Sequence, residues 1–126
     1  MPEILRRPEA RLRKLRPVYV AKGTMRTIIP AIEQILRDQF GMDIKFLKIR
    51  SRKREIVYIR YAIAAILRRH TVGSFSEIGK YLNLDHSTII YAEKQCNIAK
   101  QGYNRELMHN YSTFKDQLKQ ILFFFS

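Results

Sequence analysis

The stretch SFSEIGKYLNLDHSTIIYAEKQCNIAK, residues 74–100, holds two helical patterns separated by a short turn. Ser74 and Glu77 stand at the spacing of a capping box, which predicts a helix of about two turns. Only two residues remain before a second helical pattern resumes at Asp85, and they suffice only for a tight turn. A short helix, a tight turn and a second helix together predict a helix-turn-helix.

The flanking segments also carry apolar residues at helical spacing. Residues 24–41 predict a first helix, with Pro30 tolerated in its first turn and Gly41 as its C-terminal cap. Residues 55–70 predict the central, most buried helix. Its apolar face consists of Ile56, Ile59, Ile63, Ile66 and Leu67. No segment shows a convincing β alternation, so the predicted fold class is all-α.

The segment between these helices, residues 42–54, is expected to begin with a short turn of helix and to continue as a basic loop. Ile44, Leu47 and Ile49 are its candidate anchors to the core. The run KIRSRKR at 48–54 then has basic residues at five of its seven positions.

The C-terminal segment, residues 103–126, carries a heptad-like apolar stripe. Its positions are Leu107, Tyr111, Phe114, Leu118, Ile121 and Phe125. Two interpretations remain open from the sequence. The helix docks on the core of its own chain, or the narrow stripe, which ends in the run FFF, forms the seam of a homodimer.

Charge is the strongest compositional signal, because 24 Lys and Arg residues against 11 Asp and Glu residues give a net charge of +13. We expect a polyanionic partner, with double-stranded DNA first and RNA or the ribosome as an alternative. The positive charge is concentrated in residues 1–22 and 48–54. Residues 1–23 contain three of the four prolines and no sustained apolar period, so we predict a basic, disordered arm.

The remaining composition argues against several other classes of protein. No apolar run approaches the roughly 20 residues that span a bilayer, and the N-terminus lacks a signal-peptide pattern. We therefore expect a cytoplasmic protein without a membrane partner. Cys96 is the only cysteine, and the three histidines stand at no ligand-like spacing, so we predict no disulfide, no metal and no cofactor.

The residues LDHSTII, 84–90, admit three interpretations. Asp85, His86 and Ser87 are the residue types of a nucleophilic triad, but adjacent helical residues point about 100° apart and cannot form the hydrogen-bond relay. With no phosphate-binding glycine loop either, we predict no enzyme activity and no small-molecule substrate. Asp85 suits the N-cap of an ordinary helix. A first turn of short polar residues equally suits a helix that enters the major groove.

Several of these features together resemble one family. They are the basic loop, an Arg near the start of the long helix, the S-x-x-E-I-G helix, and D-H-S-T followed by two aliphatic residues. The combination resembles the C-terminal DNA-binding domain of the bacterial replication initiator DnaA. The resemblance implies a Trp-repressor-like helix-turn-helix bundle over residues 24–102, with the second helix of the motif in the major groove.

Carried over residue by residue, the resemblance assigns Arg52 to the minor groove and Thr88 to a phosphate. It places Asp85, His86 and Ser87 at base edges. It also implies that Arg54 and Arg60 lie near phosphates and that Lys94 is a candidate contact to the DNA backbone. Arg50 and Lys53 of the basic loop are the remaining candidate contacts to DNA.

The chain also departs from the family pattern. Asn83 and Leu84 replace an arginine that usually follows two glycines, Ile59 stands in place of a proline, and Tyr91 in place of a histidine. We therefore expect the DNA box to differ from the usual one.

The family's ATPase module has no counterpart in these residues. We expect a basic arm at 1–23, a DNA-binding domain at 24–102 and an amphipathic helix at 103–126. The predicted function is sequence-preferring DNA binding that regulates transcription or replication, in a nucleoid-associated protein of a bacterium, a phage or a mobile element. An architectural DNA-packaging protein and an RNA- or ribosome-associated protein are the alternatives.

Overall fold

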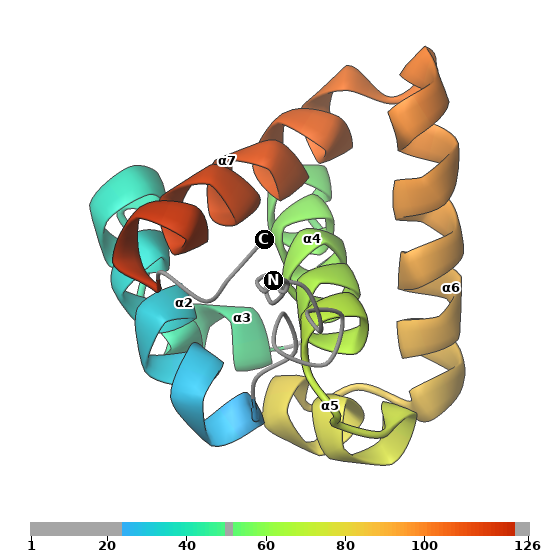
Figure 1. The fold of residues 1–126 in the computed structure, drawn as a ribbon. Coiled ribbons are helices and arrows are strands. Elements are labelled where there is room, and N and C mark those ends of the chain that lie inside the picture. The colour runs from blue at the N-terminus through green and yellow to red at the C-terminus, as the bar shows by residue number, and fades with distance from the viewer. Residues whose placement is uncertain (1–23, 50–51, 123–126) are drawn as a thin grey trace, which may run out of the picture.

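The computed structural model describes residues 24–49 and 52–122 of the chain. These residues fold into six α-helices and one π-helical turn (Figure 1). The elements are α2 (Met25–Phe40), α3 (Ile44–Lys48), α4 (Arg54–His70), α5 (Phe75–Leu82), α6 (His86–Ile98), the π-helical turn η1 (Ala99–Tyr103) and α7 (Arg105–Ile121). The predicted all-α fold is confirmed. No helix among the residues described is long and apolar enough to cross a membrane.

Helix α4 is the central element, and α2, α3, α5, α6 and α7 all pack against it (Figure 1). Ile59, Ile63, Ile66 and Leu67 are buried, as the apolar spacing predicts, and Ile56 is half-buried. Small residues complete the helix surface: Ala62, Ala64 and Ala65 are fully buried. Because alanine lets neighbouring backbones approach closely, one helix can serve as the core of the whole bundle.

Helix α2 is capped at both ends by its own sequence. The Thr24 hydroxyl accepts a hydrogen bond from the Thr27 amide at 3.2 Å, and Gly41 ends the helix with φ +64°. The prediction that Pro30 lies in the first turn is wrong, because Thr24 starts the helix at Met25 and leaves Pro30 inside it. Pro30 is exposed, so the helical hydrogen bond that it cannot donate is lost on the solvent side.

The predicted turn of helix before the basic loop is α3, and Asp43 caps it by accepting from the Lys45 amide at 2.9 Å. Leu47 is buried and Ile44 is half-buried, as expected of anchors. The expectation for Ile49 is wrong, since 59% of it is exposed. Ile49 follows the helix in extended backbone, so the helical spacing no longer directs its side chain toward the core.

The turn between α5 and α6 is closed by Gly79. The Leu84 amide donates to the Gly79 carbonyl at 2.8 Å, and Asn83 adopts the left-handed conformation with φ +60°. A Cβ atom at position 79 would lie only 2.4 Å from the Leu84 carbonyl oxygen. This contact is with backbone, so only glycine permits the turn to approach α5 so closely.

We expect Gly79→Ala to destabilise the protein by about 1–3 kcal/mol, as overpacking does, although alanine has the higher helix propensity. The control is Gly73→Ala, where the added Cβ would meet the flexible end of the Met25 side chain. Denaturant unfolding measures both variants. We expect the larger loss of unfolding free energy for Gly79→Ala. If Gly79→Ala cost no more than Gly73→Ala, the turn would be able to shift and accept a methyl group.

The apolar stripe of α7 packs on the core of its own chain. Leu107, Tyr111, Phe114 and Leu118 are buried against α4 and α2, and the Phe114 ring stacks on Phe40 with centroids 5.1 Å apart. Ile121, by contrast, is 44% exposed. Phe125 lies outside the described residues. Of the two interpretations of this stripe, docking within the chain is the one the structure shows.

Leu118→Asp should therefore unfold the domain, because it replaces a fully buried side chain with a charge and should cost at least about 3 kcal/mol. Ile121→Asp, on the same helix at an exposed position, should leave the fold intact. Circular dichroism with analytical sedimentation checks both variants. A well-folded Leu118→Asp monomer derived from a dimeric parent would contradict docking within the chain.

Candidate nucleic-acid interface

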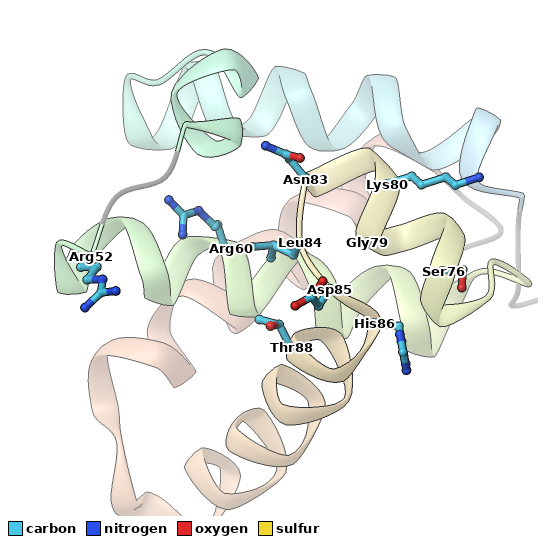
Figure 2. Close-up of a pocket in the computed structure, with 10 residues that line it drawn as sticks. All are labelled: Arg52, Arg60, Ser76, Gly79, Lys80, Asn83, Leu84, Asp85, His86 and Thr88. Atoms are coloured by element: carbon cyan, nitrogen blue, oxygen red, sulfur yellow. The ribbon is translucent and has the colours of Figure 1, made fainter.

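A groove of about 630 Å³ opens between the basic loop, α5 and the first turn of α6 (Figure 2). Its lining combines Arg52 of the basic loop and Arg60 of α4 with the continuous helix-turn-helix stretch from Ser76 to Thr88. The lining residues are Arg52, Arg60, Ser76, Gly79, Lys80, Asn83, Leu84, Asp85, His86 and Thr88. The fold thus brings the candidate minor-groove arginine, Arg52, to the same groove as the polar start of α6.

The first turn of α6 presents its polar side chains outward. Asp85 occupies the N-cap, and its carbonyl oxygen accepts from the Thr88 amide at 3.0 Å. Its carboxylate makes no capping hydrogen bond, and Asp85, His86 and Ser87 are all exposed. Thr88 is half-buried. Side-chain capping, the ordinary role for Asp85 at this position, is therefore not the role that the structure gives it.

Helix α5 offers the contrast. The Ser74 hydroxyl accepts from the Glu77 amide at 3.1 Å, and the Glu77 carboxylate accepts from the Ser74 amide at 2.8 Å. These hydrogen bonds hold the pKa of Glu77 below its usual value. The predicted capping box is present in full, so the two helices of the motif begin in different ways.

Further along α6, Ser87 and Lys94 lie on one face, because they stand about two helical turns apart. Both are exposed. Tyr91 lies between them with 51% of its surface exposed, and its ring meets Tyr61 of α4 edge to face, with centroids 5.9 Å apart. Tyr91, which departs from the family pattern, thus continues the exposed face of α6.

Arg60, which the resemblance places near a phosphate, lines the groove but is mostly buried. Only 7% of the residue is exposed. Its Nε donates to the Leu47 carbonyl at 2.8 Å, and one Nη donates to the Ile49 carbonyl at 2.7 Å. Burial lowers the pKa of the guanidinium from its usual value. Arg60 therefore ties the end of α3 to α4 and positions the start of the basic loop.

The other basic candidates differ in their surroundings. Arg52 and Lys53 are exposed ahead of α4. The Arg54 Nε lies 3.1 Å from a carboxylate oxygen of Glu106 in α7, and 71% of the Arg54 side chain is exposed. An exposed ion pair of this kind is weak and leaves the guanidinium able to reach a phosphate. Arg50 lies outside the described residues.

Sequence reasoning missed the contribution of α5. Ser76 and Lys80 are exposed, line the groove, and stand one helical turn apart on that helix. Asn83 also lines it and donates through its side chain to the Lys48 carbonyl at 3.2 Å. A signal was available, because the first helix of a helix-turn-helix crosses the DNA backbone and needs polar residues on its outer face.

No group of three or more His, Cys, Asp or Glu residues that could hold a metal ion occurs within 24–49 and 52–122. Cys96 is buried, and burial raises the pKa of its thiol to about 12. The thiolate, which is the reactive form, is therefore scarce at neutral pH.

Comparison with known proteins identifies the family of this helix-turn-helix. The family model described as the bacterial dnaA protein helix-turn-helix matches residues 29–96. The chain belongs to this family. The predicted DnaA resemblance is thereby confirmed, and α5 and α6 are the two helices of a DnaA-type helix-turn-helix, a DNA-binding motif.

The relatives of this DnaA-type domain are much longer proteins. The chromosomal replication initiator protein DnaA of Bacteroides fragilis is 33% identical over 89 residues, which cover 67% of this chain and 18% of the relative. That of Trichormus variabilis is 35% identical over 80 residues, which cover 62% of this chain and 17% of the relative. The chain thus spans less than a fifth of either relative. No solved structure matches it.

The two helix starts of the motif should respond differently to loss of their N-cap side chains. Ser74→Ala should cost about 1 kcal/mol, because the capping box is removed. Asp85→Ala should cost no more than about 0.5 kcal/mol in high salt, which screens the helix dipole. Denaturant unfolding of both variants is the measurement. A destabilisation at Asp85 as large as that at Ser74 would show that the Asp85 carboxylate caps α6 in solution.

Proposed function

We propose that this protein binds double-stranded DNA with a preference for sequence. The first turn of α6 enters the major groove, and Arg52 reaches the adjacent minor groove. The observation that carries the proposal is the single groove that Arg52 shares with Asp85, His86 and Thr88. A net charge of +13 supplies the general attraction to the DNA backbone.

The side chains at the start of α6 suit base recognition. Asp85 and His86 are exposed, and the Asp85 carboxylate is not engaged in capping. A carboxylate can accept from the cytosine N4 amino group, and a serine hydroxyl such as that of Ser87 can reach donors or acceptors on either base. We assign the contacts to base edges to Asp85, His86 and Ser87. Arg52 is assigned to the minor groove, because a narrow minor groove concentrates negative potential that attracts arginine.

A second set of side chains suits the phosphates. Ser76 and Lys80 line the groove from α5, Thr88 lines it from α6, and Lys94 extends along the exposed face of α6. Phosphate contacts fix the register of a protein on the duplex without reading its sequence. Arg60 supports this set indirectly, because its hydrogen bonds hold the backbone that leads into the basic loop.

The biological role that we propose is regulation of transcription or replication at sites related to initiator boxes, in the bacterial cytoplasm and on the nucleoid, in a bacterium, a phage or a mobile element. It is a binding role without catalysis, since adjacent residues at the start of α6 point in different directions. The relatives are named chromosomal replication initiator proteins, which supports the replication context.

The deciding experiment is selection of bound sites from a random DNA library, followed by competition with unrelated DNA and structured RNA. A specificity ratio of at least about 10³ for the selected box supports the proposal. Near-equal affinity for all duplexes would favour an architectural packaging protein instead. Preference for structured RNA would favour the ribosome-associated alternative.

The variants should divide into two classes on a panel of single-base-changed boxes. Asp85→Asn, His86→Ala, Ser87→Ala and Arg52→Ala should each relax preference at particular positions, by about 1–3 kcal/mol per good base contact. Thr88→Val should weaken binding to every box about equally, as removal of a phosphate-binding hydroxyl does. Uniform losses of affinity for the first class would refute the assignment of base contacts, and position-specific losses for Thr88→Val would refute its phosphate role.

A further inference from the structure

A second, smaller cavity lies where α6 gives way to α7. Its volume is about 300 Å³, and it is lined by Ala99, Lys100, Gly102, Arg105, Met108, His109 and Ser112. Gly102 adopts φ +94° with open space beside it, so the chain breaks its helical path here and bends into α7. The bend leaves a pocket between the end of one helix and one face of the next, and we call it the corner pocket.

The corner pocket is basic. Lys100, Arg105 and His109 are exposed and line it from two different elements, and the lining contains no carboxylate. The Lys100 ammonium also lies 4.9 Å from the centroid of the Tyr111 ring, a residue that does not line the pocket. Glu106, the nearest acidic residue in sequence, pairs with Arg54 instead. Lysine, arginine and a serine hydroxyl such as that of Ser112 are the donors that bind phosphate oxygens in proteins.

The corner pocket is separate from the groove at the start of α6, and the two share no lining residue. Because α6 has 13 residues, the pocket lies roughly 20 Å along the helix from its first turn. The major groove is only about 8.5 Å deep. A ligand in the corner pocket is therefore distinct from the bases that the first turn of α6 would read.

We propose that the corner pocket binds a phosphodiester group of DNA that lies outside the recognised box. This inference rests on the proposed function, because the proposed function supplies DNA as the source of the phosphate. The phosphate comes either from flanking DNA on the same duplex or from a second duplex. The protein would then bind DNA at two places. The groove at the start of α6 reads the sequence, and the corner pocket binds a phosphate whatever the sequence.

The test compares two charge-matched double variants. The pocket variant is Lys100→Gln with Arg105→Gln, and the control is Lys115→Gln with Lys119→Gln, which removes the same charge from α7 at positions that do not line the pocket. On an extended duplex the pocket variant should flatten the slope of log K against log salt by about 0.9 for each phosphate that it no longer neutralises. The control should leave the slope close to that of the parent.

Two arms identify the source of the phosphate. If flanking DNA fills the pocket, the flattening should disappear on a duplex trimmed to the box. If a second duplex fills it, the parent bound to an immobilised trimmed duplex should capture a labelled second duplex, and the pocket variant should not. Equal slopes for pocket variant and control on extended DNA, together with equal capture, would overturn the proposal.

Inorganic phosphate provides a readout that does not depend on box preference. Titrated into the full chain, it should shift the NMR signals of Gly102 and His109 in the parent and the control but not in the pocket variant. If no box is preferred yet these signals still shift and the slopes still differ, the proposed function fails and the corner pocket stands. If phosphate moves neither signal, or if polyglutamate competes for the pocket better than DNA does, the corner pocket is not a DNA phosphate site.

Discussion

The approach of the Leu84 carbonyl to Gly79 determines how α6 leaves α5 in the helix-turn-helix. The Leu84 amide donates to the Gly79 carbonyl at 2.8 Å, and no Cβ could occupy the space between them. The chain therefore turns within two residues of Leu82, the last residue of α5, and α6 starts beside α5. Lys80 and His86 line one groove as a result, so the composition of the interface depends on the absence of a single methyl group.

Arg60 shapes the other side of the groove, because its buried guanidinium fixes the backbone at the end of α3 to α4. Such burial is costly unless polar partners compensate it, and here two backbone carbonyls accept from the guanidinium. Arginine suits this position better than lysine, because its rigid fork can reach two acceptors at once. The backbone of Leu47 and Ile49 is fixed to α4, so Arg52, a few residues later, lies within reach of the groove.

Features that depend on residues close in sequence can be predicted from the sequence, whereas features that depend on contacts between distant segments cannot. The capping box, the Gly41 cap and the apolar face of α4 depend on neighbouring residues, and all are present in the structure. Arg60 could be recognised as a family position, but its burial depends on α3, which the local pattern around it does not reveal. Likewise, no periodicity within α5 shows that Lys80 faces the start of α6, because that adjacency follows from the turn.

The two helices of the motif begin in different ways. Helix α5 satisfies its first amides with a full capping box, whereas the Asp85 side chain leaves the first turn of α6 without such a cap. Helix α6 is held instead by packing, with Ile89, Ala92 and Cys96 buried against the core. Amide groups without a side-chain cap at a helix N-terminus favour an anion, and phosphate is the anion that DNA supplies. Under the proposed function, the missing side-chain cap therefore leaves the first amides and the first side chains of α6 available to the duplex.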